Sequence, residues 1–179
     1  MSNDSLDAEY LRSILDYNAD TGIFIWKHRP REHFATQRGM RIFNSQCAGK
    51  EAGHERHDGY LIIGLDSKIY LAHRLAWIWM TGKIPDSHID HKDNDRRNLK
   101  WKNLRAATAA QNLQNQKRRS DNSSGHKGVY WNKAAQKWQA YITSFGTYRY
   151  LGLFSNPEDA YQARCKAAKE LHGEFARVV

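Results

Sequence analysis

The N-terminal part of the chain alternates between helical and strand-like hydrophobic patterns. The first apolar group recurs at helical spacing and comprises Leu6, Tyr10, Leu11, Ile14 and Leu15. This spacing predicts a helix with one apolar face. Asn18 and Gly22 then break the pattern before the β-prone run 23–26, so we expect the helix to lead into a strand. Residues 27–56 show little periodicity and are rich in basic residues and glycine, which predicts a basic loop region.

The middle of the chain begins with a hairpin pattern and continues with a helix. Two β-prone runs, 60–65 and 68–72, flank the turn-like pair 66–67, which predicts a short β-hairpin. The apolar-rich segment 73–81 follows and is closed by Gly82, a residue that commonly ends helices. We therefore expect a core helix directly after the hairpin.

A polar run at 116–125 separates these elements from a second group. It contains no large apolar residues, which indicates a linker. Three short β-prone runs follow, at 129–132, 138–143 and 148–153. A helix is then predicted to start with Asn156 as N-cap and Pro157 in the first turn.

The charge of the chain favours a polyanionic partner. The 179 residues carry a formal net charge of +9 with a sequence pI near 9.6, and Lys and Arg gain affinity for nucleic acid by releasing counterions. A solubilising surface charge is the alternative. Cys47 and Cys165 lie far apart, which indicates neither a disulfide framework nor a thiolate zinc site. We expect a soluble protein of the bacterial cytoplasm, because no apolar run is long enough to span a bilayer.

Candidate chemistry gathers around a strand-like step that carries Asp90 and His91. Thr108 and Gln111 fit a capping box, which predicts a helix with Asn112 in its first turn. Asp90 and Asn112 could then offer oxygen ligands to one hard cation such as Mg²⁺. His91 would point to the opposite side of the strand from Asp90, because successive side chains alternate, and could act as a base.

Hydrolysis of a phosphodiester needs both of these functions. A metal neutralises charge on the phosphate, and a group titrating near neutrality takes a proton from the attacking water. Each residue also has an ordinary explanation, since an Asp–His pair often only exposes two polar side chains to solvent and an Asn in a first turn is often a local hydrogen bonder. A zinc cluster is a further alternative, and it would comprise His54, His57, His88 and His91. No cysteine joins these histidines, and their spacing is not that of a closed zinc site.

The order of several motifs resembles the HNH endonuclease family, particularly its phage and intron-encoded homing branch. The matching segments are 73–77, 89–94, 98–99, 103–105 and 108–112. The resemblance implies a ββα-metal motif with His91 as general base, Asp90 and Asn112 as metal ligands, and Asn103 as the residue that pins the loop by backbone hydrogen bonds. Many members carry His where this chain has Asn112, and the amide oxygen favours Mg²⁺ or Mn²⁺ over zinc. His73 could contact phosphate, help to order the site, or be structural.

The C-terminal third resembles the AP2 DNA-binding domain. The segments that carry this resemblance are 124–131, 137–142, 150–154, 158–161 and 171–176. It implies a three-stranded antiparallel sheet that lies in the DNA major groove and is supported by one helix. Plant members carry arginines where 130–133 stand here, so no base preference follows. The alternative is a small domain that binds protein.

The expected DNA contacts follow from strand alternation with the core-facing Ala140 and Ile142. They are Trp131, Lys133, Gln139, Tyr141 and Arg149, with Tyr148 as a further candidate. A shift of one residue in phase would flip this set. Additional basic contacts are expected from Arg105, Lys117, Arg118, Arg119 and Lys127.

We therefore expect an α+β protein with a ββα-metal HNH nuclease domain followed by an AP2-type sheet with one packing helix. The predicted segments are an N-terminal helix–strand and basic loop region (1–56), the nuclease core (57–115), a linker (116–125) and the DNA-binding domain (126–179). The expected activity is metal-dependent cleavage of double-stranded DNA by a homing or free-standing enzyme. No membrane or small-molecule cofactor is expected, and both a monomer and a weak dimer remain open. The alternative is a non-catalytic DNA-binding regulator that uses the HNH region as a scaffold.

Overall fold

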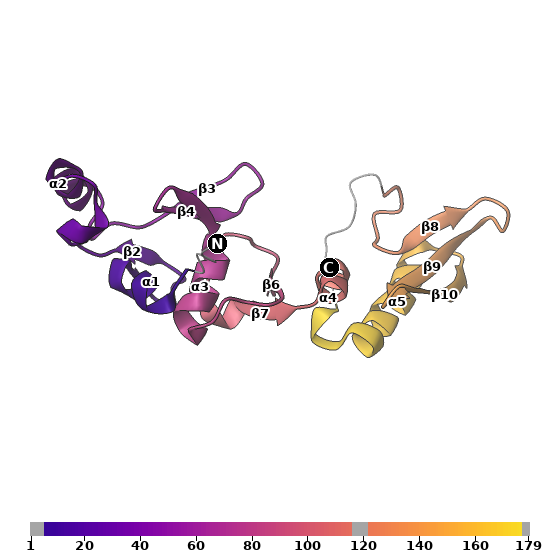
Figure 1. Ribbon diagram of the computed structural model, residues 1–179. Coiled ribbons are helices and arrows are strands. Elements are labelled where there is room, and N and C mark those ends of the chain that lie inside the picture. The colour runs from indigo at the N-terminus through magenta and orange to yellow at the C-terminus, as the bar shows by residue number, and fades with distance from the viewer. Residues whose placement is uncertain (1–5, 116–121, 177–179) are drawn as a thin grey trace. The chain divides into compact units, whose positions relative to one another are not determined.

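The computed structural model describes residues 6–115 and 122–176 (Figure 1). The chain forms two compact units, Met1–Ala106 and Ala107–Val179. The division lies between residues 106 and 107. The helix predicted to carry Asn112 therefore belongs to the second unit, whereas we expected it in one segment, 57–115, with Asp90 and His91. Most of the predicted linker, residues 116–121, lies outside the described residues. Among the described residues, none of the helices combines the length and apolar content that a membrane crossing needs.

The first unit begins with the predicted helix and strand. Helix α1 (Ala8–Ile14) starts at Asp7, whose side chain accepts hydrogen bonds from the backbone N–H groups of Glu9 and Tyr10. Strand β1 (Leu15–Tyr17) follows without a loop and pairs antiparallel with β2 (Phe24–Trp26). The expected strand is confirmed. Leu15, however, is the first residue of β1 and not the last of the helix.

The prediction that residues 27–56 form only a loop region was wrong. They contain the 3-10 helix η1 (Arg31–His33), helix α2 (Gln37–Gln46) and strand β3 (His54–Glu55). Thr36 caps α2 by accepting a hydrogen bond from the backbone N–H of Gly39 at 3.0 Å. No residue of α2 is buried, so the helix lacks the fully buried apolar stripe by which sequence patterns reveal helices.

The predicted hairpin and core helix are confirmed. Strands β4 (Leu61–Leu65) and β5 (Lys68–Leu71) pair around the turn 66–67, whose residues have positive φ angles of 48° and 65°. Together with β3 they form a sheet in the order β3-β4-β5. Helix α3 (Ala72–Thr81) follows directly and ends at Gly82, whose φ of 74° is the left-handed conformation that glycine adopts most easily.

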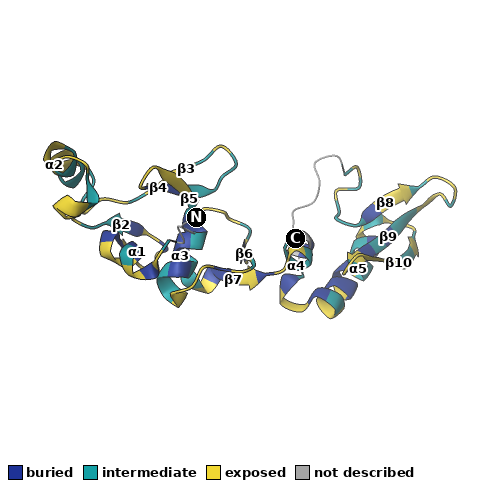
Figure 2. Cartoon of the chain, in the orientation of Figure 1, coloured by how far each residue is buried: buried dark blue, intermediate teal, exposed yellow. Residues whose placement is uncertain are grey.

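One hydrophobic core joins α1, β1, β2, β4 and α3, whereas η1 and α2 contribute no residue to it (Figure 2). Its buried residues include Leu11, Ile14, Phe24, Ile63, Leu65, Leu75, Ile89 and Leu104. A buried Arg29 also donates a hydrogen bond to Asp66 Oδ1 at 2.9 Å, which ties the N-terminal region to the hairpin turn. The expected boundary at residue 56 therefore does not separate two cores.

Two short strands complete the first unit. Strand β6 (His88–His91) and strand β7 (Leu104–Ala107) form a two-stranded sheet, and the 3-10 helix η2 (Trp101–Asn103) leads into β7. The loop 92–98 leaves the end of β6. The side chains of Asp90 and His91 thus lie at the point where a strand passes into a loop.

The second unit contains the predicted C-terminal elements. Helix α4 (Ala109–Asn115) begins with the predicted capping box, in which Thr108 N–H donates to Gln111 Oε1 at 2.8 Å and Gln111 N–H donates to Thr108 Oγ1 at 3.2 Å. Strands β8 (Val129–Asn132), β9 (Lys137–Ser144) and β10 (Thr147–Phe154) form an antiparallel sheet in the order β10-β9-β8.

One helix packs on this sheet, as predicted (Figure 1). Helix α5 (Pro157–His172) begins after Asn156, whose Oδ1 accepts a hydrogen bond from the backbone N–H of Asp159 at 2.8 Å. The 3-10 helix η3 (Gly173–Phe175) follows it. Small residues of α5 pack against the sheet, and the buried contacts comprise Ala160, Ala167 and Ala168 with Val129, Ala140 and Ile142.

Candidate functional site

Asp90 and Arg105 form a buried ion pair between neighbouring strands. Arg105 Nε and Nη2 donate hydrogen bonds to Asp90 Oδ2 at 2.9 and 2.8 Å, and the two residues are only 7% and 9% exposed. Arg105 was predicted to contact DNA, but its guanidinium group lies inside the unit against Asp90. The correction follows from strand pairing, because β6 and β7 bring these positions together. Arg105 therefore compensates the charge of the carboxylate beside His91.

His91 contacts a different set of side chains from those of Asp90. Its ring lies edge-to-face with that of His73, with centroids 5.0 Å apart, and 6.1 Å from the ring centroid of Tyr60. Burial lowers the pKa of His91 below its ordinary value of 6.5, although the nearby carboxylates oppose this shift. A lowered pKa keeps the imidazole neutral near pH 7, and a neutral imidazole is the form that can accept a proton.

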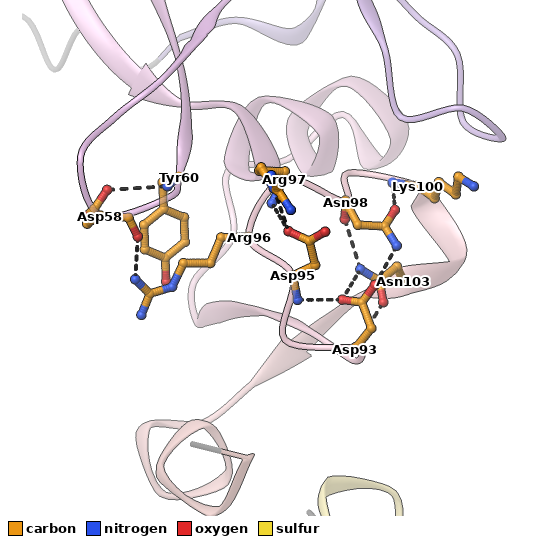
Figure 3. Close-up of polar contacts among 9 residues, drawn as sticks. All are labelled: Asp58, Tyr60, Asp93, Asp95, Arg96, Arg97, Asn98, Lys100 and Asn103. Atoms are coloured by element: carbon orange, nitrogen blue, oxygen red, sulfur yellow. Dashed lines mark hydrogen bonds and ion pairs between the residues drawn. The ribbon is translucent and has the colours of Figure 1, made fainter. Parts of the chain in front are cut away.

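Asn103 holds the loop that follows β6 (Figure 3). Its Oδ1 accepts a hydrogen bond from the backbone N–H of Asp93 at 3.1 Å, and its Nδ2 donates to Asp93 Oδ1 and to the Asn98 carbonyl, each at 2.9 Å. Its own carbonyl accepts from the backbone N–H of Lys92 at 2.9 Å. These are bonds expected of a residue that fixes the loop. Its contribution to catalysis stays a prediction.

Arg96 and Tyr60 form a contact that sequence reasoning missed. The Arg96 guanidinium carbon lies 4.5 Å from the centroid of the Tyr60 ring, and Arg96 Nη1 donates a hydrogen bond to the Asp58 carbonyl at 2.6 Å (Figure 3). The contact connects the loop after β6 with the segment before β4. No spacing pattern could have revealed it, because the residues are far apart in sequence and each sits in an irregular segment.

Asn112 lies within α4, where its backbone N–H donates to the Thr108 carbonyl at 2.9 Å. The helix belongs to the second unit, and the role of Asn112 as a metal ligand stays a prediction. The zinc alternative gains no support: within residues 6–115 and 122–176, no group of three or more His, Cys, Asp or Glu side chains could hold a metal ion. His54, His57 and His88 are exposed, whereas His91 is buried.

The register of the C-terminal sheet corrects two of the predicted DNA contacts. Trp131 pairs with Trp138, and Arg149 pairs with the buried Ile142. Because residues directly opposite one another share a face, both Trp131 and Arg149 lie on the side of the sheet that α5 covers. The prediction that they point away from the helix was wrong. The phase of β8 is set by the buried Val129, two residues before Trp131.

The opposite face of this sheet carries a cluster of tyrosines. Gln139, Tyr141 and Tyr148 lie there as predicted, and the pairing of Tyr130 with Gln139 adds Tyr130 to that face. The Tyr141 ring lies 5.6 Å from that of Tyr130 and stacks on that of Tyr148 with centroids 5.2 Å apart. Burial, followed by a hydrogen bond with Tyr148, raises the pKa of Tyr130 to about 12. We call Tyr130, Gln139, Tyr141 and Tyr148 the outer face.

The remaining predicted basic contacts have mixed outcomes. Lys133 is exposed just after the end of β8. Lys127 Nζ donates a hydrogen bond to the Gln114 carbonyl at 2.9 Å, so this ammonium group contacts the C-terminal end of α4. Lys117, Arg118 and Arg119 lie outside the described residues. The DNA contacts of all five basic residues stay predictions.

Comparison with known proteins identifies the class of the site formed around Asp90 and His91. Residues 70–114 match a family model described as HNH endonuclease, a segment that runs from β5 into α4 and contains Asp90, His91 and Asn103. The chain is also 35% identical to Protein 3.8 of Escherichia phage T7 over 109 residues, which cover 59% of this chain and 87% of that protein. The chain therefore belongs to the same family as this phage protein and carries an HNH endonuclease domain.

A solved structure is also similar to the chain. This structure is titled 'DNA binding and cleavage by the HNH homing endonuclease I-HmuI'. It matches the present chain with a TM-score of 0.43 and 20% sequence identity. The match covers 93% of this chain and 89% of that one.

Proposed function

We propose that this protein is a metal-dependent DNA endonuclease in which His91 is the general base. The observation that carries the proposal is the position of His91, a buried histidine with a lowered pKa next to Asp90 at the end of β6, inside the segment that matches the HNH endonuclease family. A phosphodiesterase of this kind needs a neutral base beside a group that can hold a cation. Asp90 and His91 supply both on consecutive residues.

His91 would take the proton of the water that attacks the scissile phosphate. Its lowered pKa keeps the ring ready to accept a proton at neutral pH. Asn103 would keep the following loop in place through its bonds with Asp93 and Asn98, so that the loop cannot fold over the base. The proton acceptor and its neighbouring loop are thus fixed before substrate binds, which is what general-base catalysis requires.

HNH nucleases generally use a divalent metal ion, and for this chain we propose a hard cation such as Mg²⁺ or Mn²⁺ with Asp90 and Asn112 as oxygen ligands. Asp90 would offer a carboxylate oxygen and Asn112 an amide oxygen. Oxygen ligands of this kind suit Mg²⁺ or Mn²⁺ better than zinc. When bound, the cation would supply charge neutralisation at the phosphate and the leaving oxygen. Arg105 would hold the Asp90 carboxylate in its orientation.

The C-terminal sheet would choose where the enzyme cuts. The unit has three antiparallel strands and one covering helix, the arrangement implied by the AP2 resemblance, and its outer face remains uncovered by α5. A sheet of this size can enter the major groove of double-stranded DNA. The outer face carries hydroxyl and amide groups in place of arginines, so hydrogen bonds from Gln139 and the tyrosines would contact the bases. Such a separate reader is consistent with a phage-type homing or free-standing endonuclease.

A plasmid-cleavage assay tests the function directly. The full chain should convert supercoiled plasmid to nicked or linear DNA with Mg²⁺ or Mn²⁺ and should be inactive in excess chelator. Cleavage that continues in excess chelator would contradict the metal dependence. Specific DNA binding without cleavage under any of these metals would instead support the non-catalytic regulator.

A further inference from the structure

Two side chains from outside β6 enclose the His91 ring. His73 comes from the first turn of α3 and Tyr60 from the residue before β4. The His73 and Tyr60 ring centroids are 5.3 Å apart, and each ring also contacts His91. The three rings thus form a closed aromatic group in which every ring touches the other two. We call this group the His91 cluster.

We propose that His73 and Tyr60 are positioning residues that fix the ring plane of His91 for proton transfer. The proposal rests on the proposed function, in which His91 is the general base. An imidazole can rotate about its side-chain bonds, and a base that is misplaced by about 1 Å loses much of its effect. The edge-to-face contact of His73 with His91 restricts this rotation, since the interplanar angle of 80° is near the geometry that aromatic rings favour.

Tyr60 is itself held by charged side chains above its ring. The Arg96 guanidinium carbon lies 4.5 Å from its centroid and that of Arg56 lies 5.9 Å from it. Arg96 also donates a hydrogen bond to the Asp58 carbonyl, close to Tyr60 in the chain. Arg96 belongs to the loop that Asn103 holds at Asp93 and Asn98. The loop that Asn103 holds is therefore connected to His91 by two successive contacts, that of Arg96 with Tyr60 and that of Tyr60 with His91.

His73 has a feature that a purely structural position would not need. It is 5% exposed, and its Nδ1 is buried without a hydrogen-bond partner among the residues that the structure describes. A buried polar atom without a partner costs free energy, so an apolar residue would serve packing better. The position therefore supplies a ring for the contact with His91 and not a hydrogen bond of its own.

Burial keeps the His73 ring uncharged at neutral pH, because it lowers the pKa of His73 to about 3. The ring therefore meets His91 as a neutral partner in the edge-to-face contact.

The test compares variants that keep a ring with variants that remove it. Tyr60→Phe and His73→Phe keep an aromatic ring, whereas Tyr60→Leu and His73→Leu do not. Nuclear magnetic resonance of labelled histidines in the full chain gives the ring shifts of His91 without any need for activity. The Leu variants should change the ring shifts of His91 and lower kcat about tenfold with unchanged DNA affinity. The Phe variants should stay close to the original chain.

The outcomes separate the positioning role from the proposed function. If His91 has the same ring shifts in both Leu variants, the positioning role is wrong. If the shifts change as expected but the original chain does not cleave DNA with any divalent metal, the positioning holds and the proposed function fails. Tyr60 is only partly buried, so Tyr60→Leu keeps the test decisive even where His73→Leu does not fold.

Discussion

Arg105 donates two hydrogen bonds to the same oxygen of Asp90, and both side chains are buried. Arg105→Met would leave the Asp90 charge buried without this partner. Loss of one partner of a buried ion pair typically costs about 3–5 kcal/mol, so we expect the free energy of unfolding to fall by this order. Denaturant unfolding with fluorescence detection measures it.

Arg97→Met is the matched control for this prediction. Arg97 also pairs with an aspartate, Asp95, but its side chain is 62% exposed. An exposed ion pair contributes at most about 1 kcal/mol. Equal and small effects of the two substitutions would show that the Asp90–Arg105 pair does not stabilise the fold.

Asn103→Ala should loosen the loop that follows β6. The substitution removes the side-chain bonds with Asp93 and Asn98, and loss of buried hydrogen bonds costs about 1–3 kcal/mol. Amide hydrogen exchange of residues 92–98 should accelerate, while exchange in α1 stays slow. Unchanged protection of the loop would mean that Asn103 does not hold it.

Stability should fall on mild acidification because His73 is buried in its neutral form. Its pKa is about 3 in the folded state against 6.5 ordinarily, so the unfolded chain binds more protons between these values. The stabilisation is complete above pH 6.5 and is lost as the pH falls toward 3. The lowered pKa of His91 acts with the same sign.

The size of this effect is measurable above the range in which carboxylates titrate. Below about pH 6 the share of His73 should approach about 1.4 kcal/mol for each pH unit. Urea unfolding between about pH 7 and pH 5 measures the slope, and His73→Phe should make it shallower. An equal slope in His73→Phe would show that His73 is not the group responsible.

The two faces of the C-terminal sheet offer a matched pair of neighbouring residues. Tyr130 and Trp131 are each 39% exposed, but the register places only Tyr130 on the outer face. If that face contacts DNA, Tyr130→Ala should weaken binding by up to about tenfold through the loss of a hydrogen bond, and Trp131→Ala should have a smaller effect. Fluorescence anisotropy with a labelled duplex compares them. A larger loss of DNA affinity in Trp131→Ala would show that the outer face is not the one that contacts DNA.

The elements with strong local signals could be predicted from sequence. The capping box at Thr108, the turn at 66–67, the Gly82 stop and the Asn156 cap each depend on residues close together in the chain. Helix α2 was missed because only Met40, Ile42 and Phe43 of its ten residues are large and apolar, and none of them is buried. Its cap at Thr36 was the available signal.

The parts of the site that were missed depend on contacts between distant residues. Asp90 and His91 were identifiable because they are consecutive, but the ion pair of Asp90 with Arg105 depends on strand pairing. The contact of Arg96 with Tyr60 joins two irregular segments. Likewise, the faces of Trp131 and Arg149 follow from sheet register, which a one-residue shift reverses.

The most direct test of the central claim compares two histidines of the same strand. His91 is buried in the His91 cluster, whereas His88, three residues earlier in β6, is exposed. His91→Ala should lower the rate of Mg²⁺-dependent plasmid cleavage by about a hundredfold or more, since general-base help is commonly worth that much, while DNA affinity stays nearly unchanged. His88→Ala should cleave at close to the original rate. Cleavage by His91→Ala at the rate of His88→Ala would contradict the assignment of His91 as the general base.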